Sequence, residues 1–199
     1  MKMSSAAPIK RPYRMSARAE AAAATGERLL AAAYGRFTSQ PYEEVRLRDI
    51  AADAGVTVQT LHNRFGSKDE LLSAAYQWWG EEETLRRDAA PVGDVPGAVR
   101  NVFDHYEAHG DAILRMLAQE DRVPAIREMT DLGREYHRDW TRRVFAPLLE
   151  ELPRGPRRER RLNGLVVATD VLVWKLLRRD MKLSRREAER TVASVIVPS

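Results

Sequence analysis

Residues 47–65 repeat one apolar spacing twice, and little but a helix-turn-helix spaces its residues in this way. A first stripe at i, i+3, i+4 and i+7 consists of Leu47, Ile50, Ala51 and Ala54. The same spacing returns at Val58, Leu61, His62 and Phe65, with His62 counted as half-buried. Gly55 stands between the stripes, where the chain must turn sharply in a conformation that is cheap only for glycine. The pattern predicts two short helices joined by a tight turn.

The second predicted helix presents polar side chains outward. Thr57 can cap it, and with Val58, Leu61 and Phe65 turned inward the opposite face carries side chains suited to base edges and phosphates in a major groove. The residues predicted to contact DNA, on this helix and beside it, are Arg48, Thr57, Gln59, Thr60, His62, Asn63, Arg64 and Lys68. The pattern therefore indicates sequence-specific binding of double-stranded DNA.

The positive charge of the chain is concentrated around this motif. Residues 1–66 hold 10 Lys and Arg against 6 Asp and Glu, whereas residues 67–199 hold 23 of each. A basic segment that meets a polyanion gains affinity by releasing counterions, so its binding should weaken as salt rises. Basic patches also serve solubility, but beside two paired helices this one favours DNA.

Residues 1–66 are predicted to hold an arm and a compact head. Residues 1–17 are basic and lack hydrophobic periodicity, which indicates a flexible arm that is either a disordered leader or a minor-groove contact. An alanine-rich amphipathic helix follows from Arg18 to Gln40. We therefore predict a three-helix DNA-binding domain at 18–66 and a larger helical domain at 67–199.

A capping sequence follows the motif directly. Ser67 and Glu70 have the spacing of a capping box, and Lys68 lies beside the positive end of the helix that this box opens. A helix N-terminus at this place is suited to hold a DNA phosphate. A capped helix with a solvated lysine is the alternative.

Helical periodicity continues to the end of the chain. Further helices are expected at 67–88, 95–109, 111–121, 124–152, 157–180 and 184–196, with breaks at Gly110 and at several prolines. No strand-like alternation persists, so an all-α fold of about nine helices is expected. The chain has no cysteine, no membrane-length apolar run and no signal core, which predicts an unexported cytoplasmic protein.

Residues of the motif and of the helix after it together resemble the N-terminal signature of the TetR family of transcriptional regulators. They are Val56, Thr60, Leu61, Phe65, Ser67, Lys68, Asp69 and Leu71. The resemblance implies a DNA-binding head and a variable helical body that binds a small ligand and forms a homodimer. The sequence departs from the family where His62 replaces a phosphate-contacting tyrosine and Arg64 a frequent histidine. His62 can also donate to a phosphate, which predicts a mild pH dependence of DNA affinity.

An apolar segment of the body resembles the dimer face of that family. Residues 162–174 carry one charge, Asp170, so this helix must be buried on several sides. A central core helix of a monomer is the alternative. The predicted face consists of Leu162, Leu165, Val166, Thr169, Leu172, Val173, Leu176, Val192, Val195 and Ile196. Asp170 should be ion-paired or contact a ligand, because a lone buried carboxylate is costly.

Aromatic and sulfur-containing residues collect on the body helices. An apolar cavity between such helices would accept a small hydrophobic or aromatic molecule, although packing alone can account for any one of these residues. The predicted pocket residues are Trp78, Trp79, Phe103, Tyr106, Met116, Met129, Tyr136, Trp140, Asp170 and Trp174. The ligand is not identified by the sequence.

No catalytic, metal or cofactor site is predicted. His105 and His109 have an i, i+4 spacing that can chelate a metal, but only half a site is visible. The chain lacks a glycine-rich phosphate loop and a serine elbow. We therefore expect a ligand-responsive repressor rather than an enzyme. The alternative is a helical small-molecule-binding or scaffold protein that has lost sequence-specific DNA binding, for which His62 and Arg64 are the supporting residues.

Overall fold

The computed structural model describes residues 11–197, with side chains from residue 19 onward. This part of the chain is helical and holds no strand, which confirms the predicted all-α fold. The helices are α1 (Arg11–Ser39), α2 (Leu47–Asp53), α3 (Val58–Phe65), α4 (Lys68–Asp88), α5 (Val95–Leu117), α6 (Pro124–Val144), α7 (Ala146–Glu150), α8 (Pro156–Ala168), α9 (Val171–Lys175) and α10 (Arg185–Ile196). A 3₁₀ turn, η1 (Tyr42–Glu44), precedes α2, and a π-helical turn, η2 (Leu176–Asp180), continues α9. None of the described helices is both long and apolar enough to cross a membrane.

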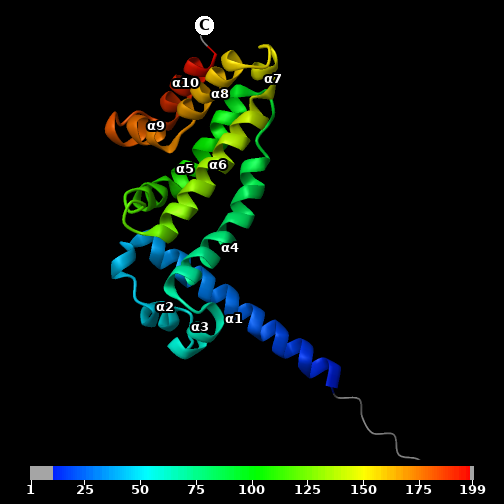
Figure 1. Cartoon of the computed structure of the whole chain (residues 1–199), viewed down its shortest axis with the longest axis vertical. Helices are drawn as coiled ribbons and strands as arrows, with labels where there is room; N and C mark the ends of the chain where they lie inside the picture. Colours follow the sequence, from blue (N-terminus) through cyan, green and yellow to red (C-terminus); the bar gives the residue numbers. More distant parts are fainter. Residues whose placement is uncertain (1–10, 198–199) are drawn as a thin grey trace, which may run out of the picture.

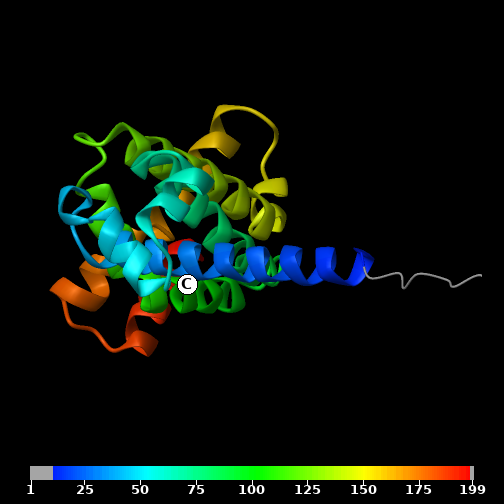
Figure 2. The ribbon, with the colours of Figure 1, turned by 90° about the horizontal axis from the view of Figure 1, so that it is seen from below.

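The helices form an elongated molecule whose two ends are connected by α4, α5 and α6. In Figure 1, α1, α2 and α3 lie at one end, and α8 and α10 lie at the other end beside the C-terminus. Between them α4, α5 and α6 pack against one another. The first turns of α1 project beyond the rest of the molecule when it is seen from below (Figure 2). The helix-turn-helix is therefore far from α8 and α10, and α4 leads from it into the body.

Two hydrophobic cores occupy the two ends. The body core is formed by α5 to α10 around large buried side chains that include Phe103, Trp140 and Trp174. The head core, built from α1 to α4, also takes in Met116 from the end of α5 and Ile126 from the start of α6. The head is therefore packed directly against the body, and this shared core crosses the domain boundary that we predict after residue 66.

The helix α1 begins earlier than the sequence pattern predicts. Its first residue is Arg11 rather than Arg18, so residues 11–17, which we predict as part of an arm, are helical. The first ten residues lie outside the described part of the chain. Missing hydrophobic periodicity argues against a packed helix, but a helix that already exists extends at little cost through good helix formers such as alanine and arginine.

The predicted break at Gly110 is wrong, because α5 runs through this residue without interruption. A Cβ atom added to Gly110 would lie 2.4 Å from a ring carbon of Trp174. This glycine therefore allows a close approach between α5 and α9 and does not end a helix.

Two helices that were predicted as continuous are divided. The predicted helix 124–152 is interrupted at Phe145, between α6 and α7. The predicted helix 157–180 is interrupted at Thr169 and Asp170, between α8 and α9. There the Asp170 side chain accepts the backbone N–H of Leu172 at 2.8 Å and caps α9. A short side chain that bonds the backbone at a helix start competes with the continuous helix that apolar periodicity favours.

Candidate DNA-contacting helix and ligand pocket

The helices α2 and α3 have the geometry of the predicted helix-turn-helix. Gly55 has a φ of 68°, in the left-handed region that the turn requires. The backbone N–H of Val56 donates to the Ala51 carbonyl at 2.9 Å and closes the turn. Thr57 caps α3, since its side-chain oxygen accepts the N–H of Thr60 at 3.1 Å. The turn therefore fixes the direction in which α3 leaves α2.

The outward face of α3 carries exposed polar side chains. The Gln59 amide donates to Asn63 Oδ1 at 2.8 Å, and the hydroxyl oxygens of Thr57 and Thr60 lie 2.9 Å apart. All four side chains are exposed. Such amides and hydroxyls can exchange these mutual bonds for bonds to base edges when a major groove approaches.

Two members of the predicted inward stripe of α3 are exposed. Val58 is 36% exposed, and the exposed His62 ring has its Nδ1 at 2.8 Å from the Gly66 carbonyl. Leu61 is fully buried and Phe65 is half-buried. The prediction that His62 is half-buried is therefore wrong. A helix as short as α3 needs little more than one buried row, and the His62 ring instead lies against the turn that ends the helix.

The three cationic residues that we predict to contact DNA, Arg48, Arg64 and Lys68, differ in their surroundings. Arg48 is exposed beside Asp49, with 3.3 Å between Nε and Oδ1. Arg64 donates from Nη1 to the Ala22 carbonyl of α1 at 2.9 Å. Its guanidinium therefore faces α1, and its role in contacting DNA stays a prediction.

Lys68 lies against the turn η1. Its ammonium group is 4.1 Å from the centre of the Tyr42 ring and donates to the Tyr42 carbonyl. Burial lowers the pKa of Lys68. The predicted capping box beside it is confirmed: the Ser67 N–H donates to Glu70 at 2.7 Å, and the Glu70 N–H donates to Ser67 Oγ at 3.1 Å. Lys68 would have to leave Tyr42 to reach a phosphate.

A cavity of about 610 Å³ lies in the body, walled by α4, α5, α6 and the junction of α8 and α9. This volume falls in the range of small-molecule sites. Of the residues predicted for a pocket, the cavity wall contains Trp79, Tyr106, Met116, Met129, Tyr136 and Asp170. Sequence reasoning therefore identified part of this wall, while other apolar lining residues such as Ile113, Leu117 and Leu132 were not predicted.

Four residues predicted for the pocket lie elsewhere. Trp78 is exposed, and Phe103, Trp140 and Trp174 are buried in the body core. The indole N–H groups of the two buried tryptophans have partners there: Trp140 donates to the Arg87 carbonyl at 2.9 Å, and Trp174 donates to Glu107 at 3.1 Å. An aromatic side chain indicates burial, but its residue type does not say whether core or cavity wall surrounds it.

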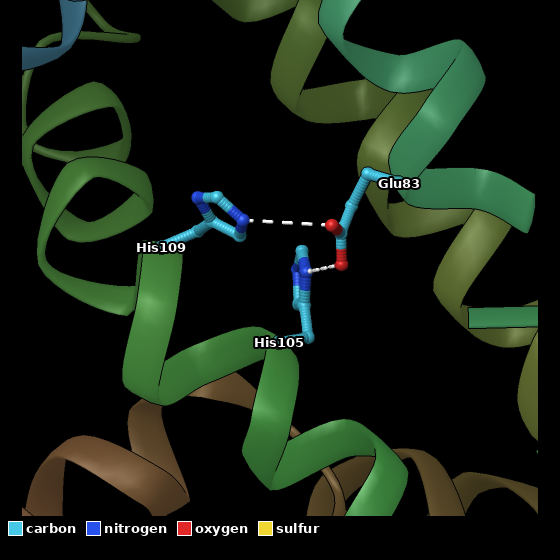
Figure 3. A group of neighbouring side chains, drawn as sticks. All are labelled: Glu83, His105 and His109. Carbon is cyan, nitrogen blue, oxygen red and sulfur yellow. Dashed lines mark hydrogen bonds and ion pairs between the residues drawn. The ribbon is translucent and has the colours of Figure 1, made fainter. Parts of the chain in front are cut away.

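One polar cluster of the cavity wall joins α4 and α5. Glu83 accepts a hydrogen bond from His105 Nδ1 at 2.6 Å, and its second oxygen lies 3.5 Å from His109 Nε2 (Figure 3). Burial lowers the pKa of His105 to about 4 and also lowers that of His109, so both rings are neutral at pH 7. Burial acts to raise the pKa of Glu83, but the two histidines outweigh it and the net shift is downward. The ligand atoms of the three residues lie within 4.8 Å of one another, a spacing that can hold a metal ion.

A second polar cluster of the wall joins α4 and α6. Arg87 Nη2 lies 3.4 Å from His137 Nδ1, and His137 Nε2 lies 3.2 Å from the Thr169 hydroxyl and 3.4 Å from the Val166 carbonyl. Burial lowers the pKa of His137 to about 3, with the charge of Arg87 acting in the same direction. The ring is therefore neutral, and these partners favour the tautomer with its proton on Nε2.

Sequence reasoning missed Glu83, Arg87 and His137. A signal was present on α4, where Glu83 and Arg87 stand four and eight residues after Trp79 and continue its inward stripe. A charged side chain on an apolar stripe has to find a partner or a ligand. His137 gave no comparable signal.

The predicted dimer face is divided between the protomer core and the surface. The residues buried in this chain's own core or against it are Leu162, Leu165, Thr169, Val192 and Ile196, while Val166 and Val173 are half-buried. Leu172, Leu176 and Val195 are exposed, and Val167, which was not predicted, is 64% exposed. The exposed members therefore lie on the outer side of α8 to α10, because the inner sides of these helices pack on α5 and α6.

Asp170 has neither an ion-pair partner nor full burial within the described residues. It is half-buried, lines the cavity and caps α9. Its capping bond satisfies one carboxylate oxygen, and an ion pair across a dimer or a contact with a ligand stays a prediction.

Comparisons with known proteins show what this chain is similar to. Residues 29–75 match the model of the family described as bacterial regulatory proteins, tetR family. A curated relative, the HTH-type transcriptional regulator CymR from Pseudomonas putida, is 32% identical over 117 residues. The match covers 55% of this chain and 58% of that protein, which is less than two thirds of its length.

Two solved structures share the fold. A transcriptional regulator from Rhodococcus sp. Rha1 has a TM-score of 0.65 and 19% identity, over 85% of this chain and 92% of that chain. A TetR-like transcriptional regulator from the same source has a TM-score of 0.64 and 20% identity, over 86% of this chain and 93% of that chain. At this identity the likeness establishes the fold alone.

Proposed function

We propose that this chain is a transcriptional regulator of the TetR family, whose model residues 29–75 match, and that it acts as a ligand-responsive homodimeric repressor that binds a palindromic DNA operator. The observation that carries the proposal is the course of α4. This helix begins directly after α3 and places Glu83 and Arg87 in the cavity wall. One continuous helix thus connects the two candidate sites. We assign the chain no catalytic role.

The DNA-reading surface in this proposal is the exposed face of α3. Gln59 and Asn63 read base edges in a major groove, and Thr57 and Thr60 contact the edges or the backbone beside them. One head covers only a few base pairs. Two heads of a dimer read half-sites about 34 Å apart, which gives the operator its palindromic form.

The dimer in this proposal forms through the outer surface of α8 to α10. Val167, Leu172 and Val195 are 64%, 59% and 60% exposed there. Exposed apolar side chains at one end of a molecule, away from its DNA-reading end, support an interface between copies of the chain.

Ligand binding releases the operator by changing the spacing of the two heads. A molecule that fills the cavity presses on α4, and α4 transmits this displacement to α3. The shared core around Met116 and Ile126 carries the same displacement from α5 and α6 to the head. A dimer whose heads no longer match the distance of about 34 Å between successive major grooves binds less tightly.

The test is a selection of bound duplexes from a random pool by the full chain, followed by titration of the winning duplex against salt. Enrichment of a palindrome and affinity that falls steeply with salt are expected. If no sequence is enriched, the repressor proposal is wrong and the chain is a small-molecule-binding or scaffold protein.

Variants separate base contacts from phosphate contacts. Gln59→Ala and Asn63→Ala should each weaken the selected duplex by about 1–3 kcal/mol and relax its sequence preference. Glu135→Gln at an exposed position of α6 is the control and should change neither property. Lys68→Ala should weaken all duplexes alike and reduce the salt slope by about one. If the Lys68 variant binds DNA with unchanged affinity, Lys68 does not contact a phosphate and only packs against Tyr42.

A further inference from the structure

Arg87 is a buried cation without a carboxylate partner in the described part of the chain. Only 4% of the residue is exposed, although it lines the cavity. No Asp or Glu oxygen of the described residues lies within 4.0 Å of its guanidinium, and its Nε has no hydrogen-bond partner there. A guanidinium in such surroundings normally pairs with an anion, because burial of an unpaired charge is costly.

The neighbours of Arg87 hold its position but do not neutralise it. Its guanidinium carbon lies 4.5 Å from the centre of the Trp140 ring and 5.5 Å from that of Tyr136. His137 offers Nδ1 at 3.4 Å, and this ring is uncharged. Aromatic faces and a neutral imidazole stabilise a cation only in part. An anion next to Arg87 would therefore stabilise its buried charge further.

The nearby carboxylates are engaged with other partners. Glu83, one turn earlier on α4, is bonded to His105 and faces His109. Asp88 accepts from Tyr136 at 2.9 Å and pairs with Arg143. Asp170 caps α9. Glu83 and Asp88 are not available to Arg87 without losing a bond that each makes in the structure, and Asp170, whose one oxygen caps α9, has no oxygen within 4.0 Å of the guanidinium.

Much of the remaining cavity wall is apolar and partly aromatic, and the charged residues Glu120, Glu128 and Arg134 also line it. Trp79, Met116 and Met129 line it, and flat or polarisable surfaces of this kind suit an aromatic ring. A cavity of about 610 Å³ with one buried cation therefore fits a small molecule with an aromatic body and one anionic group.

We propose that the effector of this regulator is a small aromatic carboxylate, whose carboxylate pairs with the Arg87 guanidinium while its ring contacts the apolar wall. The assignment rests on the proposed ligand-responsive function and adds the chemical class of the ligand.

Binding to the full chain without DNA tests this class directly. Benzoate, 4-methylbenzoate and 2-naphthoate are each compared with their primary amides, which match them in shape and lack the charge, by isothermal titration calorimetry. At least one carboxylate should bind more tightly than its amide by a factor on the order of thirtyfold or more, as expected for a buried charge pair. Equal affinities within every pair, or no binding by any carboxylate, would overturn the proposal.

Variants assign the preference to one side chain. Arg87→Met should abolish the difference between acid and amide, and Arg87→Lys should keep part of it. The control is Arg86→Met, which removes the neighbouring exposed arginine that pairs with Glu82 and should leave the difference unchanged. If the Arg87→Met protein is folded by circular dichroism and still prefers the acid, Arg87 is not the anchor.

Operator release is measured separately by fluorescence anisotropy of a labelled duplex. A carboxylate that binds through Arg87 but leaves the duplex bound would support the ligand class and contradict the proposed repressor mechanism. If the amides release the duplex as readily as the acids do, the repressor mechanism is supported and the proposed ligand class is contradicted. The two failures are therefore distinguishable.

Discussion

Lowering the pH from 7.5 to 5 should destabilise the folded chain through two buried histidines. Burial lowers the pKa of His105 to about 4 and that of His137 to about 3, from an ordinary value of 6.5. At pH 5 both rings remain neutral in the folded chain, whereas both are protonated in the unfolded chain. The stability that depends on the neutral rings is complete above about pH 6.5 and is lost as the pH falls below it.

The size of this effect follows from proton linkage. At pH 5 each histidine lowers the free energy of unfolding by about 2 kcal/mol, so the pair lowers it by about 4 kcal/mol. Between pH 5 and 6 the slope is about 1 kcal/mol per pH unit for each ring. The pKa of His109 is also lowered by burial and acts in the same direction. A loss of this size is a large fraction of the stability of an ordinary domain.

Urea unfolding at steps between pH 5 and 7.5 measures this slope, at one fixed protein concentration because self-association would affect stability. His137→Gln should reduce the slope by about 1 kcal/mol per pH unit, whatever it does to the stability itself. Tyr136→Phe is the control. Burial and the bond to Asp88 raise the pKa of Tyr136 to about 12, so this change removes a hydrogen bond without altering proton binding in the window. A wild-type slope in the His137→Gln variant would refute the reasoning.

Two further perturbations test the packing and the dimer. Gly110→Ala should destabilise the fold by about 1–3 kcal/mol, because the added Cβ meets the Trp174 ring. Gly133→Ala on α6, where nothing lies within 4 Å, should instead stabilise it by up to about 1 kcal/mol; equal urea midpoints would contradict the contrast. Val167→Glu and Val195→Glu should each shift the protein toward monomer in sedimentation velocity without unfolding it, and unchanged sedimentation would exclude this surface as the interface.

The helix-turn-helix could be predicted from sequence because its determinants lie close together along the chain. The buried Ala51 and Leu61, the left-handed Gly55 and the capping Thr57 all fall within a few residues of one another. Each acts through the local backbone or through the neighbouring helix. Local chemistry of this kind can be identified without knowledge of the remaining fold.

The body was predicted less completely because its geometry depends on distant contacts. Gly110 has the local properties of a helix breaker, and only the Trp174 ring, brought against it by folding, makes it a packing residue. Asp170 interrupts a run that is otherwise apolar, and its backbone bond at Leu172 outweighs the periodicity. Such competitions are decided by tertiary structure, and a single sequence does not contain their outcome.

The polar groups of the cavity show what a sequence can and cannot supply. Glu83 and Arg87 stand one turn apart on the inward stripe of α4, so the sequence alone requires that each find a partner. The structure meets this requirement for Glu83 through His105 on α5, but it gives Arg87 only aromatic rings and a neutral histidine. Since the two side chains share one helix and one cavity, their difference is not a consequence of burial. It follows from the side chains that the neighbouring helices place beside each residue. These helices place no carboxylate beside Arg87, and a carboxylate ligand would supply the missing negative charge.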